Sequence, residues 1–308
     1  MGKRLIIDNP FYDGNASSSA FGWEFQVDAA IFLFIKYIDQ IEKIVVEGKY
    51  QDIELICKNN KHIYAQAKSI SNGSNENRKK KLEDAIISLA KTPADTSLND
   101  DLLYISNYSA PINEKNIFNN SVIRLKNQKD EKIEFEKQIN ILLSKLDNKI
   151  KNCNNNQQKG KLDKLKKRIS NINTDEFLVS TIFPYGITEQ KEDKYVSLFQ
   201  EINLLLSNKY GIRSQSLQDI VRRVLVEWHF TFLYNSTISP EKIEKSIDKD
   251  SLLWQIVVIL SDIDIDMEKL MDEEIEYDLF DEFESYWHQY NTSIHIRFDF
   301  FNRLSTMI

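Results

Sequence analysis

Residues 47–70 read EGKYQDIELICKNNKHIYAQAKSI, and the predicted sheet is built outward from them. Residues 52–57 and 62–69 are largely apolar runs, and a short link rich in Lys and Asn joins them. Two such runs around a short polar link are typical of neighbouring strands that pair as a hairpin. The stretch therefore predicts the centre of a sheet that the rest of the chain completes.

Three polar residues lie where these two strands would bring them side by side. Successive side chains of a strand point to opposite faces, so Gln66 and Lys68 share a face while Ala67 turns into the core. Asp52 opens the first strand, and pairing of the strands brings it beside this face. An acid, an amide oxygen and an ammonium group on one patch are the groups that metal-dependent cleavage of a phosphodiester needs.

The segments around this hairpin alternate between helical and extended patterns. Apolar residues recur every three or four positions over residues 21–41, which predicts a helix ahead of the first strands. Short apolar runs predict strands at 44–46, 102–106 and 177–183, and a second helix is expected at 82–91. This order predicts an α/β fold with a mixed sheet flanked by helices.

The remaining segments are predominantly helical. Apolar positions at helical spacing in residues 133–150 and 162–172 predict a helical hairpin inserted before the last strand. An all-α C-terminal region is expected, with helices at 191–207, 216–234, 240–247, 252–260 and 267–290. The predicted organisation is a core of residues 1–112 completed by 175–190, an inserted basic hairpin in 113–174, and a helical domain for oligomerisation or partner binding in 191–308.

Charge is distributed unevenly along the chain. The formal net charge of −7 by itself argues against a nucleic-acid partner. Between residues 124 and 168, however, there are 14 Lys or Arg and 6 Asp or Glu, whereas residues 262–284 hold 12 acids and one Lys. Such a chain has a basic region for a polyanion and an acidic region for another partner, although two solvated helical surfaces give the same pattern.

Composition excludes several classes of protein. The two cysteines cannot form a disulfide framework, and no paired Cys and His spacing indicates zinc. No apolar run is long enough for a membrane span, and the run near the N-terminus is too short for a signal peptide. No Gly-rich phosphate-binding loop is present. We expect a cytoplasmic protein that is not itself an ATPase.

The order of elements and these residues resemble the PD-(D/E)XK nuclease superfamily, which has the restriction-endonuclease-like fold. That superfamily carries an acid on one strand, here Asp52, and (Asp/Glu/Gln)-x-Lys on the next, here Gln66-Ala67-Lys68. The Gln form, with Gly22-Trp-Glu-Phe-Gln26 opening the preceding helix, is most similar to effector nuclease domains of bacterial anti-phage systems. Those include the nuclease domain of cyclic-oligonucleotide-dependent effectors and the nuclease subunit of Lamassu-type systems. The resemblance covers residues 22–110 and extends at most to 177–186.

The resemblance implies a Mg²⁺-dependent DNA endonuclease, with Mn²⁺ as an alternative metal. Asp52 and Gln66 would supply oxygen ligands to the ion, and the backbone carbonyl of Ala67 is a third candidate. Lys68 would orient the attacking water or stabilise charge that grows on the phosphate.

A further acidic ligand is expected, because Gln66 stands where a second carboxylate would lie. Glu24, which projects from the first helix, is the expected ligand, directly or through water. Glu47 and Glu54 are the alternatives, and Glu54 shares a strand face with Asp52. Structural explanations are also open, since an acid in a first helical turn favours the helix dipole and Asp52 could simply end a turn.

Two basic segments are candidate nucleic-acid contacts. Arg78, Lys79, Lys80 and Lys81 follow the Gln-Ala-Lys strand, at the end of a Ser- and Asn-rich loop and the start of the next helix. The inserted hairpin carries the larger basic excess. A phosphate backbone could meet either segment, and a solvated run of charge is the alternative for both.

The resemblance to Lamassu-type subunits implies double-stranded DNA as substrate. It also implies an SMC-like ATPase and a small third subunit as partners, and activation by homo-oligomerisation. The chain after the nuclease segment is too short for the nucleotide-sensing domain of the cyclic-oligonucleotide effectors. The alternative is a catalytically inactive nuclease fold that serves as a DNA-binding or scaffolding subunit of a defence complex, for which Asp52 and Lys68 are dispensable.

Overall fold

The computed structural model describes residues 17–70, 74–93, 100–112, 121–183, 194–212, 217–238 and 245–264. Within these ranges seven strands form one sheet in the order β5-β6-β4-β3-β2-β1-β7. The strands are β1 (Ile41–Val46), β2 (Ile53–Cys57), β3 (His62–Lys68), β4 (Asp101–Ser106), β5 (Ser121–Arg124), β6 (Phe177–Thr181) and β7 (Ile247–Asp248). The expected mixed sheet flanked by helices is confirmed.

The direction of the strands defines two ends of this sheet. β1, β2 and β3 are antiparallel neighbours, whereas β3, β4 and β6 run parallel. β5 and β7 pair antiparallel at the two edges. The Lys68 end, as we name it, holds the turn from Glu47 to Asp52 and the last residues of β3, β4 and β6. The Asp101 end holds the first residues of β4 and β6.

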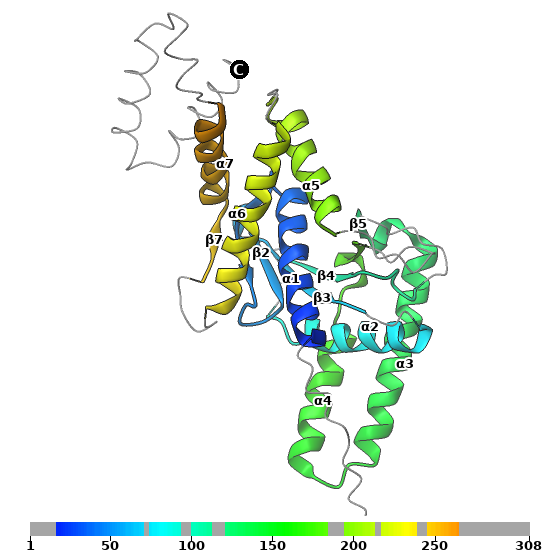
Figure 1. The fold of residues 1–308 in the computed structure, drawn as a ribbon. Helices are drawn as coiled ribbons and strands as arrows, with labels where there is room; N and C mark the ends of the chain where they lie inside the picture. The colour runs from blue at the N-terminus through cyan, green and yellow to red at the C-terminus, as the bar shows by residue number, and fades with distance from the viewer. Residues whose placement is uncertain are drawn as a thin grey trace, which may run out of the picture.

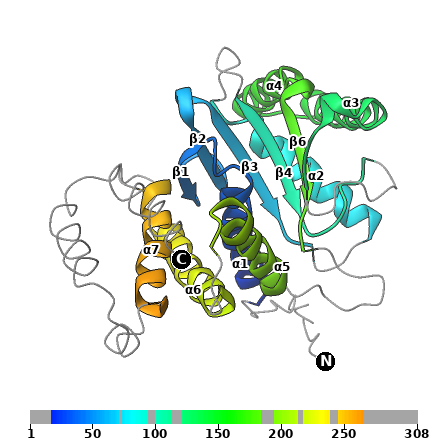
Figure 2. The same ribbon diagram turned by 90° about the horizontal axis from the view of Figure 1, so that it is seen from above.

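Helices cover both faces of the sheet (Figure 1; Figure 2). One face carries α1 (Ser17–Lys36), α5 (Lys194–Leu204), α6 (Leu217–Thr237) and α7 (Lys249–Asp264). The other carries α2 (Asn75–Leu89), α3 (Lys129–Lys151) and α4 (Asn156–Ser170). Short helical turns are η1 (Lys58–Asn60), η2 (Leu125–Asn127), η3 (Thr174–Glu176) and the π-helical η4 (Leu205–Lys209). None of the helices in the described ranges is long and apolar enough to cross a membrane.

The helix α1 lies at the centre of the larger core. Every residue from Val27 to Phe34 is buried, because the sheet covers one side of α1 while α5 and α6 cover another. Phe34 packs edge-to-face on Trp228 of α6, with ring centroids 5.1 Å apart. Asp28 lies within this run and is fully buried despite its carboxyl group. The C-terminal helices and the sheet therefore share one continuous core.

A second core lies between the opposite face of the sheet and the helices α2, α3 and α4. The rings of Phe135 on α3 and Phe177 on β6 lie 4.3 Å apart there. Leu142 and Leu146 continue this apolar side of α3. Beyond this contact the hairpin projects away from the sheet (Figure 1). The inserted helical hairpin expected from the sequence is thus present.

Several elements differ from the sequence-based expectations. α2 begins at Asn75 rather than residue 82, so the basic run 78–81 lies inside the helix and not in a loop. The sheet also includes β5 and β7, which were not expected. Ile247 belongs to β7 instead of ending a helix that spans 240–247, and most of that predicted helix lies outside the described residues, as does the one at 267–290.

Candidate active site

Asp52, Gln66 and Lys68 meet at the Lys68 end of the sheet. The antiparallel register of β2 and β3 places Asp52 beside Gln66. Asp52 Oδ2 accepts hydrogen bonds from the backbone N–H of Ala67 at 3.0 Å and from Lys68 Nζ at 3.2 Å. The carboxylate is therefore held against the strand that carries the other two groups.

The two faces of β3 are covered by different helices. Ala65 and Ala67 belong to the core beneath α1, whereas Tyr64 belongs to the core beneath α2. Gln66 and Lys68 therefore point to the α2 side, which confirms that they share a face. Gln66 is only 3% exposed, whereas the Lys68 side chain is 23% exposed. The amide is thus buried in the site, and the ammonium lies at its mouth.

Glu47 is the second acid at this end of the sheet. Its φ of 53° is uncommon outside glycine, and its N–H donates to the carbonyl of Asp52 at 2.7 Å, which closes the turn between β1 and β2. Burial and the neighbouring Asp52 carboxylate raise the pKa of Glu47. Lys245, Lys68 and a hydrogen bond from Gln26 act on this pKa in the opposite direction. Among the acids considered from the sequence, Glu47 is the one that the structure brings to Asp52.

The helix α6 and the segment just before β7 hold this turn from one side. Asn235 of α6 is buried, and its Oδ1 accepts the backbone N–H of Val46 at 3.0 Å. Lys245, which is also buried, donates from Nζ to the backbone carbonyl of Glu47. Burial lowers the pKa of Lys245, while the Glu47 carboxylate raises it. A second ammonium group therefore lies next to the acids of the site.

The helix α2 holds the same turn from the other side. Gln51 is buried, and its Nε2 donates to the backbone carbonyl of Ser88 at 2.9 Å. Sequence reasoning did not identify Gln51, Asn235 or Lys245. The only signal for Gln51 in the sequence was its position next to Asp52. No local pattern marks Asn235 or Lys245, which are separated from their partners in the turn by 189 and 198 residues.

Glu24, the acid expected from the first helix, is engaged elsewhere. Its Oε1 lies 2.6 Å from Lys194 Nζ and accepts a hydrogen bond from the Tyr195 hydroxyl at 2.8 Å. Burial opposes ionisation of Glu24, but hydrogen bonds from Lys194 and Tyr195 outweigh it and lower its pKa. The same Lys194 lies 2.9 Å from Asp28, which His229 also approaches. Glu24 thus belongs to a charged group between α1, α5 and α6.

The opposite side of α1 explains why Glu24 does not reach Asp52. A Cβ at Gly22 would lie 3.5 Å from Ser69 Oγ, just beyond β3, and Gln26 contacts Glu47. Residues four apart lie on one side of a helix, so Gly22 and Gln26 form the side that faces the Lys68 end. Glu24 lies midway between them in sequence and therefore on the far side.

Glu54, the other alternative ligand, shares the face of Asp52 but pairs with a histidine. Its Oε1 lies 2.7 Å from His62 Nδ1, and the His62 ring stacks on Tyr64 at a centroid distance of 5.5 Å. The structure therefore supplies Glu54 with a partner of its own.

The basic run on α2 begins at the Lys68 end of the sheet. Ser74 caps the helix by accepting the Asn77 N–H at 3.3 Å. Arg78 Nη1 donates to Ser109 Oγ at 3.0 Å, which ties the helix to the segment after β4. Lys79 and Lys80 are exposed, whereas Arg78 and Lys81 are half-buried. Two of the four predicted nucleic-acid contacts thus face solvent.

The donors at the Lys68 end fit Mg²⁺. Glu47 and Asp52 offer two carboxylates and Gln66 offers an amide oxygen, and all of these are hard donors. Across the described ranges, no three His, Cys, Asp or Glu side chains gather in a way that could hold a metal. A dedicated protein cage is thus absent there, but Mg²⁺ keeps several waters and is commonly bound through one or two carboxylates.

The similarity of this chain to a known protein is structural and weak. No protein-family model matches the chain, and no curated protein matches it. Among solved structures it is similar to the Cap4 SAVED/CARF-domain-containing receptor from Moraxella osloensis, with a TM-score of 0.42 and 12% identity over 79% of this chain. The chain spans 48% of that protein, about half its length. Function is therefore argued from the site.

Proposed function

We propose that this chain is a Mg²⁺-dependent endonuclease that hydrolyses phosphodiester bonds of double-stranded DNA. The observation that carries the proposal is the meeting of Asp52, Gln66, Lys68 and Glu47 at one end of the sheet. Carboxylates in a turn whose hydrogen bonds fix their separation, beside a lysine at a strand end, are suited to a reaction in which a phosphate gains negative charge. The resemblance of these residues to the PD-(D/E)XK pattern supports the same activity.

Each group has a separate task in this mechanism. Asp52, Glu47 and Gln66 would hold the ion, with Mn²⁺ as an alternative to Mg²⁺. The bound ion supplies a Lewis acid for the phosphate and lowers the pKa of a bound water. Lys68, held 3.2 Å from Asp52, donates a hydrogen bond to the attacking water or to the phosphate oxygen that gains charge. One such preorganised donor contributes about 3 kcal/mol to the barrier.

The surroundings of the site reduce the reorganisation that the reaction requires. Gln51 ties the catalytic turn to α2, and Asn235 and Lys245 tie it to the C-terminal segment. The donors are therefore in position before a substrate arrives, which is the condition under which fixed dipoles and charges are most effective.

A plasmid-cleavage assay tests this activity. Wild-type protein should nick or linearise supercoiled DNA in Mg²⁺ and not in EDTA, and Asp52→Asn and Lys68→Ala should each slow cleavage about 10²- to 10³-fold. Lys43→Ala, a change of an exposed strand lysine that pairs with Asp248, is the matched control and should cleave normally. Equal cleavage by all four proteins would contradict the catalytic assignment.

We further propose that the enzyme is an effector of a bacterial anti-phage defence system of the Lamassu-like type. The sequence resemblance supports an SMC-like ATPase and a small third subunit as partners, and a homo-oligomer as the active form. Affinity purification of the chain, expressed together with its neighbouring genes, should recover an ATPase subunit. Recovery of the chain alone from such an expression would contradict the proposed assembly.

A catalytically inactive nuclease fold is the second candidate. It is favoured by the balance of charge at the site, where two carboxylates are accompanied by the ammonium groups of Lys68 and Lys245. Carboxylates whose negative charge is offset by nearby ammonium groups attract a divalent ion less strongly. In that case DNA binding persists, and Asp52→Asn alters neither binding nor assembly. A loss of cleavage in this variant excludes the second candidate.

A further inference from the structure

The helix α4 carries a concentration of positive charge that the candidate site does not use. Six of its 15 residues are Lys or Arg and one is Asp. The cationic face, as we name it, consists of Lys161, Lys164, Lys167 and Arg168, all of which are exposed. Cations in a last helical turn favour the helix dipole, which accounts for Lys167 and Arg168. That effect does not account for Lys161 and Lys164, which lie further from the C-terminus.

The direction of this face follows from the packing of α4. Leu162, Leu165 and Ile169 turn inward to the second core. Lys166 lies on the flank towards α3, where it pairs with Asp147 at 2.6 Å. Arg168 Nη1 lies 3.4 Å from the backbone carbonyl of Lys91, just beyond α2. Lys161, Lys164 and Arg168 are spaced by three and four residues. They therefore lie on one flank of α4, the flank where Arg168 meets the end of α2.

This flank leads towards the candidate active site. Lys91 is exposed, and its backbone N–H donates to the carbonyl of Ser88 at 2.9 Å. Ser88 holds Gln51, the neighbour of Asp52 in the catalytic turn. The cationic face of α4 and the acids of the site are thus connected through the C-terminal end of α2. From Lys161 to Arg168 the face extends about 10 Å along the helix, which corresponds to about three base steps of duplex DNA.

We propose that the cationic face of α4 binds the sugar-phosphate backbone of duplex DNA beside the bond to be cleaved. The inference rests on the proposed function for its choice of polyanion. A protein partner is disfavoured, because interfaces between proteins are anchored by buried aromatic and apolar side chains. None of the large apolar side chains exposed in the described part of the chain lies on α4.

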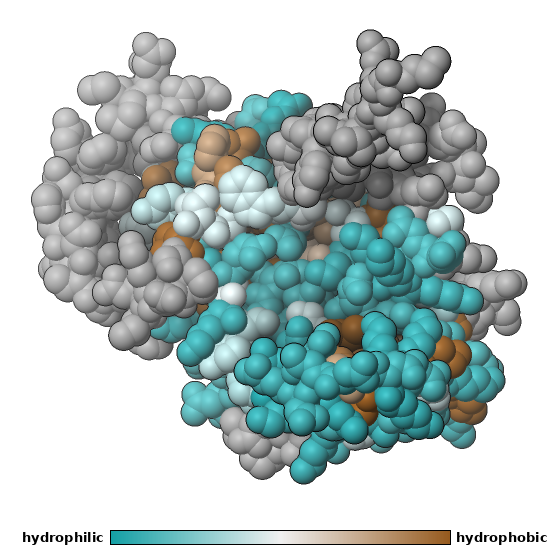
Figure 3. All heavy atoms as spheres, turned by 90° about the horizontal axis from the view of Figure 1, so that it is seen from below, coloured by the Kyte–Doolittle hydropathy of each residue, from teal (hydrophilic) through white to brown (hydrophobic). Residues whose placement is uncertain are grey.

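The surface around the hairpin has the character expected for such an interaction. Viewed from below, the direction in which the hairpin projects, the described surface is predominantly hydrophilic, with small and scattered hydrophobic areas (Figure 3). Interfaces with DNA are polar, wet and positively charged. The hairpin therefore positions the duplex through its backbone and contributes no preference for a base sequence.

The salt dependence of DNA binding tests this proposal. The full-length chain carrying Asp52→Asn, so that DNA stays intact, is titrated onto a fluorescent duplex of about 30 base pairs at several salt concentrations. Changing Lys161, Lys164 and Lys167 to Gln should reduce the slope of log K against log salt by about 0.9 for each phosphate that the variant no longer neutralises. We expect a total reduction of about 2 to 3, and a Kd at least about tenfold higher at 100 mM salt.

A matched control removes the same charge elsewhere. Three exposed lysines in η2 and the first half of α3 serve for this: Lys126, Lys129 and Lys137. They follow β5, whose last residue lies at the Asp101 end of the sheet. Their triple change to Gln should leave the slope within about 0.5 of the parent. Circular dichroism of both variants checks that the hairpin remains helical. A slope that is unchanged in the α4 variant, or reduced equally in both variants, overturns the proposal.

The outcome also separates this inference from the proposed activity. If wild-type protein does not cleave DNA but the α4 variant binds it more weakly, the backbone interaction stands and the nuclease assignment fails. If cleavage depends on Asp52 while the α4 variant binds DNA as the parent does, the backbone interaction fails alone. Normal DNA binding by the α4 variant with loss of a co-purified subunit would identify an acidic protein as the occupant and overturn the proposal.

Discussion

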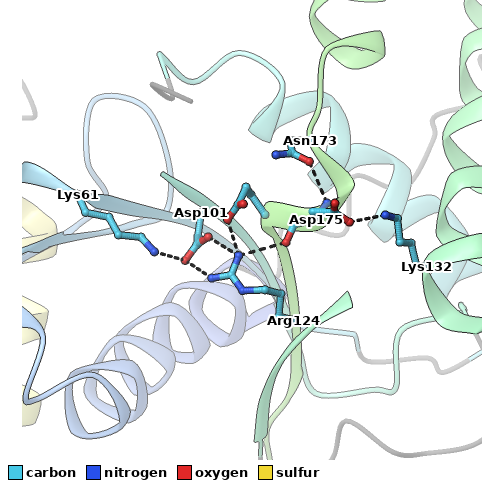
Figure 4. A network of polar contacts seen from close by, with 7 residues as sticks. Lys61, Asp101, Arg124, Lys132, Asn173 and Asp175 are labelled. Carbon is cyan, nitrogen blue, oxygen red and sulfur yellow. Dashed lines mark hydrogen bonds and ion pairs between the residues drawn. The ribbon is translucent and has the colours of Figure 1, made fainter. Parts of the chain in front are cut away.

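The two ends of the sheet both hold carboxylates, but their surroundings differ. At the Asp101 end, Asp101 is 2% exposed and meets both terminal nitrogens of Arg124 at 2.7 and 2.8 Å, and Lys61 at 2.8 Å (Figure 4). The same guanidinium donates to Glu176 Oε2 at 2.6 Å and to the carbonyl of Asp175. Both oxygens of Asp101 therefore have cationic partners.

At the Lys68 end the pairing is looser. Asp52 shares one oxygen between a backbone N–H and Lys68, and its carboxylate raises the pKa of a second acid, Glu47. The two ends differ accordingly in the direction of their pKa shifts. Burial opposes ionisation of Asp101, but hydrogen bonds from Arg124 and Lys61 outweigh it and lower the pKa. For Glu47, burial and the nearby acid raise the pKa.

A structural acid and a functional acid can be distinguished by the cations and acids around them. An acid that joins segments of the fold is stabilised by cations that match its geometry, as Arg124 matches Asp101. Acids that are gathered to bind a cation repel one another until that cation arrives, which shifts the pKa of one of them upward. The Lys68 end has this second character, so the two ends should respond differently to the same kind of substitution.

The largest effect is expected from substituting, one at a time, the two glutamates that are candidates for the second acidic ligand. Glu47→Gln removes a carboxylate next to Asp52, and we expect the rate of plasmid nicking to fall about 10²- to 10³-fold. Glu24→Gln removes an acid that pairs with Lys194 and Tyr195, and its rate should change by less than about threefold. Nicking rates of both variants, measured over a range of Mg²⁺ concentrations, check this. A loss with Glu24→Gln as large as with Glu47→Gln would contradict the assignment.

The sequence pattern identifies three members of this site directly and names the fourth, Glu47, only as an alternative to Glu24. Alternation within a strand is a local property, so Asp52, Gln66 and Lys68 could be grouped without a structure. The position of Glu24 depends on which side of α1 faces β3. Because α1 is buried on nearly all sides, its apolar pattern does not distinguish those sides. Glu47 is placed by the turn in which it lies, whose positive φ has no sequence marker at a glutamate.

The differences in the fold have equally local causes. The run of Arg78 to Lys81 contains no apolar residue, so helical periodicity becomes visible only at Leu82, although Ser74 and Glu76 already provide a cap and an acid for the first turn. β5 and β7 have four and two residues, too few for an alternating pattern. They are strands because they find β6 and β1 as partners, and this depends on tertiary contacts.

The second prediction compares stability at the two ends. Asp101→Asn removes the buried carboxylate that joins Arg124 to Lys61, and we expect the free energy of unfolding to fall by about 3 kcal/mol. Asp52→Asn also removes repulsion from Glu47, so the change should stay within about 1 kcal/mol. Urea denaturation followed by circular dichroism measures both, with equal slopes against urea as the control. Equal losses in the two variants would remove the contrast between the ends.

The third prediction concerns the support of the catalytic turn by α6. Asn235→Ala leaves the buried N–H of Val46 without its acceptor and should cost about 1 to 2 kcal/mol. Hydrogen exchange of peptides that cover residues 41–53 should accelerate, because this turn loses a fixed point. Thr237→Ala, an exposed change on the same helix, is the control and should leave exchange unchanged. Unaltered exchange in Asn235→Ala would show that α6 does not hold the turn.

The smallest effect is a difference in acid sensitivity. The pKa of Asp101 in the folded protein lies below its ordinary value of 3.8, so its ionised form stabilises the fold at higher pH. This contribution is complete above about pH 4 to 5 and is lost as the pH falls below 3.8 through the folded pKa. As the pH falls from about 4 to 5 towards the folded pKa, wild-type protein should lose stability more steeply than Asp101→Asn. The difference between their free energies of unfolding should therefore narrow. Asp39 and Asp175 also have lowered pKa values, but both proteins contain them, so their effects cancel in the difference. A gap that stays constant down to about pH 3 would mean that Asp101 stabilises the fold by its shape and hydrogen bonds, not by its charge.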